Sequence, residues 1–182
     1  GQPIATASLA GDVIKCVAVV PGYDGEGAAA RATSAVVAEA EARGTGRQFI
    51  YTKPENRAIF ENLGFRPLAT VNAADAAEGV LLLEHGRPDF ASWLRDTGSA
   101  LPRGSADGAV VVNCNPFTLG HRWLMEQAAA ACDHLLVLVL AGDRSSFPGA
   151  VRMQLVRQGT ADLPNVTVAS GDAYCVAGAT FP

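Results

Sequence analysis

The sequence predicts an α/β fold in two successive parts, each built around its own sheet. Three observations predict it. Short runs rich in Val, Ile and Leu alternate with helical segments, glycine-bearing loops separate these segments, and a polar stretch interrupts the pattern near the middle of the chain. We therefore expect a first domain over 1–97, a linker over 98–108 and a second domain over 109–182.

The first part predicts a mixed sheet. Two strands, Ile4–Ala10 and Val13–Val20, flank the turn-forming pair Gly11-Asp12, which favours a hairpin. A glycine-rich loop over 21–27 leads into an alanine-rich helix, Ala28–Arg43, that ends before a glycine. The elements expected after it are a strand, a helix and two further strands, at Gln48–Thr52, Pro54–Leu63, Phe65–Val71 and Gly79–Glu84.

The second part predicts a parallel sheet. Its strands carry no polar alternation, which is typical of strands covered by helices on both faces. Right-handed crossovers would bring the loops after the strands to one edge, where ligands bind. The expected order is strand 109–113, helix 120–132, strand 134–141, helix 149–160 and strand 165–169. We expect Trp93, Trp123 and the run Leu135–Leu140 to belong to the core.

Composition excludes several classes of protein. The chain has 182 residues, 49% of them hydrophobic and 18% charged, and a net charge of -4, which describes a soluble globular protein without the basic face that nucleic acid requires. The longest apolar run, 135–141, is too short for a bilayer, which takes roughly 20 residues. We expect no membrane partner.

The four cysteines are scattered and form no C-x-x-C pair, so we expect reduced thiols in a cytoplasmic protein. The chain begins with Gly1 in place of Met, and we expect a fragment truncated at both ends.

The loop between the strand at 109–112 and the following helix has the chemistry of a phosphate cradle. Unpaired N–H groups and the positive end of the helix dipole would face the loop, and Thr118 and His121 would add side-chain donors. Gly120 would leave room for a phosphate to approach. ATP is the ligand that we expect at this loop. Read singly, Thr118 also suits a helix N-cap and His121 a packing role at a helix start.

The string Thr118-Leu119-Gly120-His121 after a hydrophobic strand resembles the T/H-x-G-H signature of nucleotidyltransferases. The longer pattern resembles the citrate lyase ligase family, and its segments are Val110–Arg122, Gly159-Thr160, Asn165–Val168 and Ala179–Pro182. Such ligases carry an acetyltransferase-like domain ahead of the nucleotidyltransferase domain. Here the loop Val19–Ala29 resembles the acetyl-CoA loop of GNAT acetyltransferases, with Asp24 where Gln or Arg is usual. Asn56 and Leu63-Gly64-Phe65 resemble their later helix.

The resemblance implies an incomplete GNAT-like mixed-sheet domain followed by an incomplete Rossmann-like parallel-sheet domain of the nucleotidyltransferase kind. It implies ATP-dependent, AMP-forming acetylation, through acetyl-AMP, of the thiol of a CoA-like prosthetic group on the citrate lyase acyl carrier subunit. Acetate would be the acid, ATP with Mg²⁺ the nucleotide substrate, and no tightly bound cofactor or protein-held metal is expected.

The same resemblance implies roles for individual residues. Catalysis falls to His121 and Thr118. The residues expected to bind the nucleotide are Asn113, Asn115, Pro116, Phe117, Gly120 and Arg152. Those expected to bind the CoA-like group are Val19, Gly25, Gly27, Ala28 and Asn56.

Two other functions stay open at this point. One is a nucleotidyltransferase that adenylylates a phosphate-bearing small molecule, of the phosphopantetheine or nicotinamide mononucleotide type. The other is a non-catalytic module that docks a carrier protein.

Overall fold

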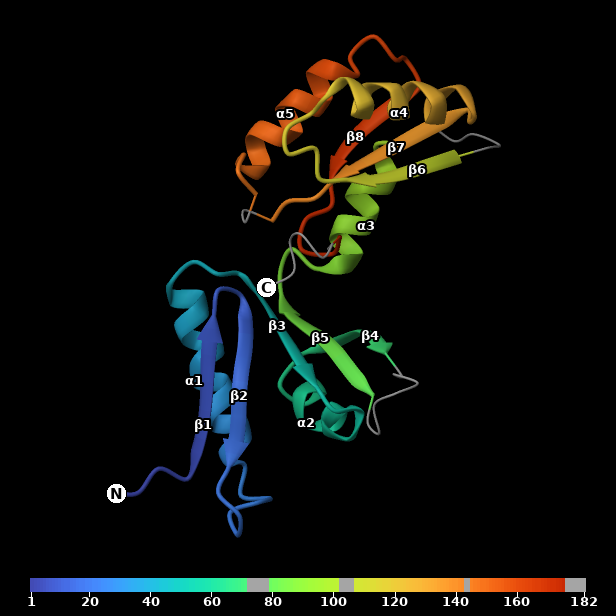
Figure 1. Cartoon of the computed structure of the whole chain (residues 1–182). Helices are drawn as coiled ribbons and strands as arrows, with labels where there is room; N and C mark the ends of the chain where they lie inside the picture. Colours follow the sequence, from blue (N-terminus) through green and yellow to red (C-terminus); the bar gives the residue numbers. More distant parts are fainter. Residues whose placement is uncertain (72–78, 102–106, 143–144, 176–182) are drawn as a thin grey trace. The chain divides into compact units, whose positions relative to one another are not determined.

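The structure is a computed structural model of the whole chain, and it describes residues 1–71, 79–101, 107–142 and 145–175 (Figure 1). The chain divides into two compact units, Gly1–Phe90 and Ala91–Pro182. Each unit has its own hydrophobic core and its own sheet, one mixed and one parallel. The predicted α/β class, with a mixed sheet followed by a parallel sheet, is therefore confirmed.

The first unit is a five-stranded mixed sheet in the order β1-β2-β3-β5-β4. Only the β2–β3 pair is parallel, and the other pairs are antiparallel. Its elements are β1 (Ala5–Ala10), β2 (Val13–Val19), α1 (Ala28–Ala42), β3 (Arg47–Thr52), a 3₁₀ turn η1 (Pro54–Asn56), α2 (Arg57–Glu61), β4 (Arg66–Val71) and β5 (Val80–Gly86).

The sheet of the first unit opens between β2 and β3. These strands pair only where Val13 faces Phe49 and Ile14 faces Ile50. Beyond that point Cys16 takes a left-handed backbone conformation with φ 55°, and the β1–β2 register shifts by one residue. Such a bulge bends the strand that carries it. The two strands consequently diverge toward the end of β2, as Figure 1 shows.

The core of the first unit lies beneath this opening. Six buried apolar residues form it: Ile14, Ile50, Phe60, Phe65, Leu81 and Leu83. The rings of Phe60 and Phe65 meet edge to face with centroids 6.0 Å apart, a favoured aromatic geometry. Ile14 and Ile50 are also the last paired residues of β2 and β3, so the core fixes where the two strands separate.

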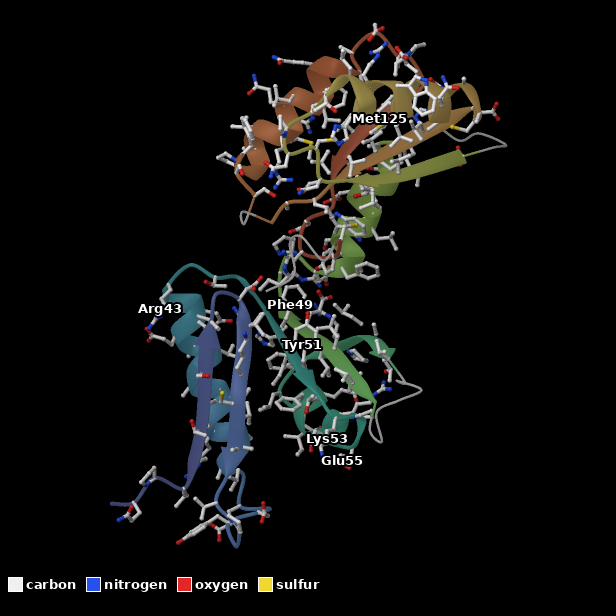
Figure 2. All side chains as sticks on the ribbon, in the orientation of Figure 1. Arg43, Phe49, Tyr51, Lys53, Glu55 and Met125 are labelled. Carbon is white, nitrogen blue, oxygen red and sulfur yellow. The ribbon has the colours of Figure 1, made fainter. Side chains whose placement is uncertain are left out.

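The second unit is a three-stranded parallel sheet in the order β6-β7-β8. Two right-handed crossovers in the same direction place both connecting helices on one face, and Figure 1 shows α4 and α5 there. Met125 of α4, labelled in Figure 2, is fully buried against this face. The elements are α3 (Phe90–Ser99), β6 (Asp107–Val112), α4 (Leu119–Ala130), β7 (His134–Val139), α5 (Gly149–Gly159) and β8 (Val166–Ser170).

The predicted linker 98–108 differs from what the structure shows. Residues up to Ser99 belong to α3, a helix that the sequence pattern did not predict, and β6 already begins at Asp107. The compact units divide between Phe90 and Ala91, ahead of the expected division at 97. Residues 102–106 of this stretch lie outside the described part of the chain.

Two expectations about burial were wrong in part. The central strand β7 is buried along nearly its whole length, as predicted, but β6 alternates between exposed and half-buried residues up to the buried Val112, and Val111 is 54% exposed. Trp123, expected in the core, is 62% exposed. It lies two residues before the buried Met125, which places it about 200° away around the helix.

Candidate functional site

The loop from Asn113 to Thr118 joins the carboxyl end of β6 to the start of α4. The loop after β7 ends at the same edge of the sheet, because β6 and β7 are parallel and in register, with Val112 opposite Val139. This edge is where open parallel sheets bind ligands. The loop 113–118 therefore lies at the edge of the sheet where the sequence analysis expected it, and its phosphate-binding role stays a prediction.

Thr118 and His121 contact each other at the start of α4, of which Thr118 is the N-cap. The backbone N–H of Thr118 donates to Nδ1 of His121 at 3.1 Å, and Oγ1 of Thr118 lies 2.8 Å from the same nitrogen. A backbone N–H can only donate, so Nδ1 is an acceptor and carries no proton. The ring proton therefore sits on Nε2, which has no hydrogen-bond partner among the described residues and is the donor left for a ligand.

Phe117 supports the imidazole from one side. The rings of Phe117 and His121 stack with centroids 5.9 Å apart and an angle of 25° between their planes. Phe117 also contacts Gly159 at the end of α5, where a β-carbon would lie 2.9 Å from two ring atoms and closer still to Cε1. The stack thus depends on a glycine some 40 residues away in sequence, and the only sequence signal for this glycine is the family resemblance.

Gly120 has open space on its protein side. A β-carbon there would meet only Thr118 Oγ1, at an ordinary 3.7 Å. Packing within the protein therefore does not require a glycine at this position, and only a bound ligand could require it.

We expect Gly120→Ala to raise the free energy of unfolding by up to about 1 kcal/mol, because alanine favours a helix. We also expect it to weaken ATP binding about tenfold or more, since the added methyl group would face the phosphates. Isothermal calorimetry and urea unfolding measure the two effects. Gly98→Ala, in α3 and equally unobstructed, is the matched control and should leave ATP affinity unchanged. An unchanged affinity in Gly120→Ala would remove Gly120 from the site.

Arg152, predicted to bind the nucleotide, is 0% exposed. Its guanidinium donates to main-chain carbonyls of Phe147, Asn113, Leu140 and Gly142 at 2.6–3.0 Å and to Oδ1 of Asn113 at 2.8 Å. Direct contact with a phosphate would require it to leave these acceptors. Arg152 is thus buried beneath the loops after β6 and β7 and hydrogen-bonded to the backbone of both.

Of the other predicted nucleotide-binding residues, Asn113, Asn115 and Phe117 are half-buried in the loop before α4, Pro116 is exposed in the same loop, and Gly120 is exposed in the first turn of α4. Asn115 Oδ1 accepts the backbone N–H of Phe147 at 2.9 Å. The two asparagines therefore connect the loop after β6 to the loop after β7.

Arg122 is a residue that the sequence analysis did not single out. It donates to Asp162 through both terminal nitrogens, to Glu126 at 2.7 Å and to the carbonyl of Gly159 at 2.7 Å. These hydrogen bonds raise the pKa of Arg122 further above its usual range and lower the pKa of Asp162. The contacts fix the end of α5 against α4, and the only available signal was the position of Arg122 directly after His121.

Cys114, which stands between Asn113 and Asn115 in the loop before α4, is buried. Burial raises the pKa of its thiol to about 11, although the charge of Arg152 opposes the rise. The thiol therefore stays protonated and unreactive at neutral pH. Within the described residues, no group of three or more His, Cys, Asp or Glu side chains could hold a metal ion.

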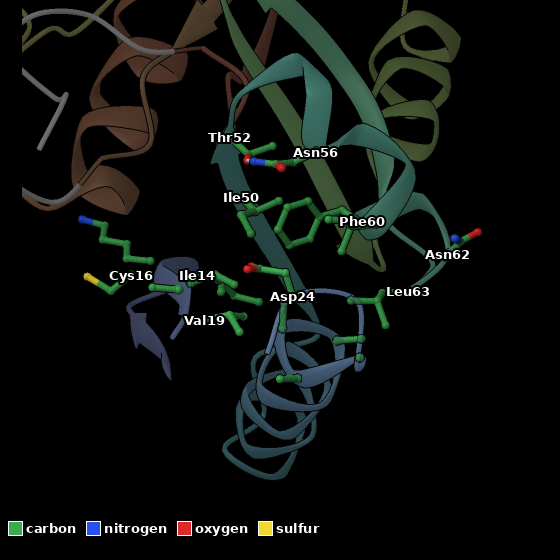
Figure 3. Close-up of a pocket in the computed structure, with 18 of the residues that line it drawn as sticks. Ile14, Cys16, Val19, Asp24, Ile50, Thr52, Asn56, Phe60, Asn62 and Leu63 are labelled. Carbon is green, nitrogen blue, oxygen red and sulfur yellow. The ribbon is translucent and has the colours of Figure 1, made fainter. Parts of the chain in front are cut away.

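The first unit holds a separate pocket of about 670 Å³ where β2 and β3 diverge (Figure 3). The structure brings together here all five residues predicted for the CoA-like group: Val19, Gly25, Gly27, Ala28 and Asn56. Gly25 and Gly27 have φ of 86° and 71°, a region that favours glycine. Asn56 is held by a 3.0 Å hydrogen bond from its amide nitrogen to Thr52 Oγ1.

The other residues that line this pocket include Lys15, Cys16 and Asp24. Cys16 is an exposed free thiol, and Figure 3 shows it at the edge of the pocket. Sequence reasoning did not find Lys15 or Cys16, because the register shift in β2 where they lie has no local sequence signal. Asp24 places a carboxylate in the lining of the pocket, which disfavours an anionic group beside it.

No helix in the part of the chain that the structure describes is both long and apolar enough to cross a membrane.

Comparison with known proteins gives both units relatives. Residues 107–182 match the family described as the citrate lyase ligase C-terminal domain. The chain is 37% identical to a citrate (pro-3S)-lyase ligase of Klebsiella pneumoniae over 98% of its own length and 51% of that protein. It is 38% identical to a phosphopantetheine adenylyltransferase of Symbiobacterium thermophilum over 34% of its own length and 40% of that protein.

A solved GCN5-related N-acetyltransferase from Rhodopseudomonas palustris covers 47% of this chain and 56% of its own, with 24% identity and a TM-score of 0.42.

The mixed sheet, the parallel sheet and the strand–loop–helix site define an α/β chain, and three of its curated relatives are ligases. By sequence, the chain is similar to citrate lyase ligases over nearly its whole length, and its residues 107–182 match the C-terminal domain of that family. It spans about half the length of the curated relatives that it matches.

Proposed function

We propose that the full-length protein catalyses ATP-dependent, AMP-forming acetylation of the thiol of a CoA-like prosthetic group on the citrate lyase acyl carrier subunit. The observation that carries the proposal is the start of α4, where the Thr118 amide occupies Nδ1 of His121 and leaves Nε2–H as a donor. The name of the family's members supports citrate lyase as the target.

In the first step, a carboxylate oxygen of acetate attacks the α-phosphorus of ATP while the bond to the bridging oxygen breaks. Pyrophosphate leaves with the electron pair, and acetyl-AMP forms. Negative charge accumulates on the phosphoryl oxygens, so catalysis means positioning and charge stabilisation. His121 Nε2–H and the free N–H groups of the first turn of α4 supply donors for it. Mg²⁺ would arrive with ATP and neutralise phosphate charge.

In the second step, the thiol attacks the acetyl carbon, AMP leaves with the electrons of the broken C–O bond, and the thiol proton passes to water or to AMP. The products are the acetyl thioester and AMP. The pocket of the first unit suits the arm that bears this thiol, because β2 offers an unpaired strand edge beyond Ile14 for the amide groups of an extended chain.

The test is release of pyrophosphate from ATP by the full-length protein, with and without acetate and the acyl carrier subunit. We expect release that requires acetate, and transfer of labelled acetyl to the carrier that requires both. Pyrophosphate release that is indifferent to acetate would contradict the proposal. Calorimetry that detects no ATP binding would favour a non-catalytic docking role.

A second function is favoured by one observation, the similarity to a phosphopantetheine adenylyltransferase. In that reaction a substrate phosphate would attack the same α-phosphorus in place of acetate. A screen with phosphopantetheine and nicotinamide mononucleotide as acceptors separates the two proposals, because release triggered by either compound and not by acetate would promote the adenylyltransferase.

The pocket of the first unit can be tested through its own thiol. We expect iodoacetamide to modify exposed Cys16 first and buried Cys114 last, since the raised pKa of Cys114 leaves almost no thiolate. Dephospho-CoA at saturating concentration should slow alkylation of Cys16 about tenfold or more and leave Cys132 unaffected. Peptide mass spectrometry after timed quenching measures both rates. Equal rates with and without dephospho-CoA would exclude this ligand from the pocket.

A further inference from the structure

Arg152 connects the two loops at the carboxyl edge of the parallel sheet. It projects from α5 and is fully buried. Nη1 donates to the carbonyl of Asn113 in the loop after β6 and to the carbonyl of Leu140 after β7, at 3.0 and 2.6 Å. Nη2 and Nε donate to the carbonyls of Gly142 and Phe147, at 2.7 and 2.9 Å. One planar guanidinium thus fixes the backbone at four points in two loops.

The same guanidinium orients the side-chain amide of Asn113. Arg152 Nη1 can only donate, so the atom 2.8 Å from it must be the amide oxygen. Ser145 Oγ donates to this oxygen as well, at 3.3 Å. The amide nitrogen of Asn113 is therefore turned away from Arg152, and it has no hydrogen-bond partner among the described residues.

Asn115 repeats this arrangement one step along the loop. Its amide oxygen accepts the backbone N–H of Phe147, whose carbonyl in turn accepts from Arg152. The amide nitrogen of Asn115 also has no partner among the described residues. Two amide nitrogens next to the start of α4 are thus donors without acceptors, and both oxygens are held by one network.

We propose that Arg152 is a positioning residue, which locks the loops after β6 and β7 together and presents the amide nitrogens of Asn113 and Asn115 to the phosphates of a nucleoside triphosphate. This inference rests on the proposed function of the same site. Arg152 acts through the asparagines and does not itself touch the ligand. A lysine cannot replace it, because one ammonium group cannot reach acceptors that the planar fork spans.

The experiment compares Arg152→Lys, Asn113→Asp and the double variant in the full-length protein. Asn113→Asp keeps an oxygen for Arg152 and Ser145 but removes the free amide donor. We expect each single variant to raise the dissociation constant for ATP about tenfold or more, and the double variant to lose clearly less than the sum of the two single losses, since both substitutions act on the Asn113 donor and only Arg152→Lys also acts on Asn115. Arg157→Lys, an exposed position on the same helix, should behave as wild type.

A second readout needs no nucleotide. Hydrogen exchange of the backbone amides at 113–118, 140–142 and 145–147 should accelerate about tenfold or more in Arg152→Lys, while exchange in β7 stays slow. Unchanged exchange in these loops, or additive effects of the two substitutions on ATP affinity, would overturn the inference. Wild-type protein that binds ATP but releases no pyrophosphate would sink the proposed function and leave these two comparisons intact. Wild-type protein that does not bind ATP would overturn both.

Discussion

His121→Ala is expected to lower kcat/KM for acetate-dependent pyrophosphate release by roughly 100- to 1000-fold, the usual loss when one preorganised donor to a developing anion is removed. The same substitution removes the acceptor of the Thr118 N–H, which should cost about 0.5–1.5 kcal/mol of the free energy of unfolding. Stopped-time assays of pyrophosphate and urea unfolding measure the two losses. On its own this variant cannot separate a catalytic imidazole from a helix cap.

His121→Glu separates them. A carboxylate three residues after the N-cap can accept the Thr118 N–H, and it is favoured at the positive end of the helix dipole. The free energy of unfolding of His121→Glu should therefore exceed that of His121→Ala by about 1 kcal/mol. It offers no proton and adds negative charge beside the phosphates, so its activity should be no higher than that of His121→Ala. If activity instead followed stability through the series, His121 would be a cap and nothing more.

The elements that the sequence pattern predicted are those whose signals are local. Strand and helix bounds in both units fall within a few residues of the expected ones, since glycines and apolar runs mark them. The helix α3 was not predicted, because its last turn contains Thr97 and Gly98, which are poor helix formers. A distant contact supports it: Trp93 donates to the carbonyl of Ser170 at 2.9 Å and its ring contacts Tyr174.

The candidate site divides in the same way. The position of Thr118 and His121 at a helix start followed from a local pattern, and the structure has it. The burial of Arg152 did not, because its acceptors come from positions 5 to 39 residues away along the chain and are backbone carbonyls, which every residue possesses. No property of the residue type indicates that such carbonyls converge. The sequence therefore predicted which edge of the sheet carries the candidate site. It did not predict which side chains hold the loops at that edge in place.

Gly159→Ala is the substitution that should join stability and activity most directly. The new methyl group would overlap the ring of Phe117, so Phe117 must shift, and its stack on His121 must loosen. Overpacking of this kind costs about 1–3 kcal/mol, which exceeds the gain of up to about 1 kcal/mol that alanine brings to a helix. We expect urea unfolding to show a lower free energy of unfolding, and we expect kcat/KM to fall about tenfold.

The cause can be checked with a smaller partner. Phe117→Leu in the Gly159→Ala background relieves the overlap, so the double variant should be more stable than the sum of the two single losses predicts, by about 1 kcal/mol or more. Its activity should stay low, because leucine restores the packing but offers His121 no ring to stack on. Additive losses of stability would mean that the glycine is required for another reason, such as the bond from Arg122 to its carbonyl. Recovery of activity along with stability would mean that the stack has no part in holding the imidazole.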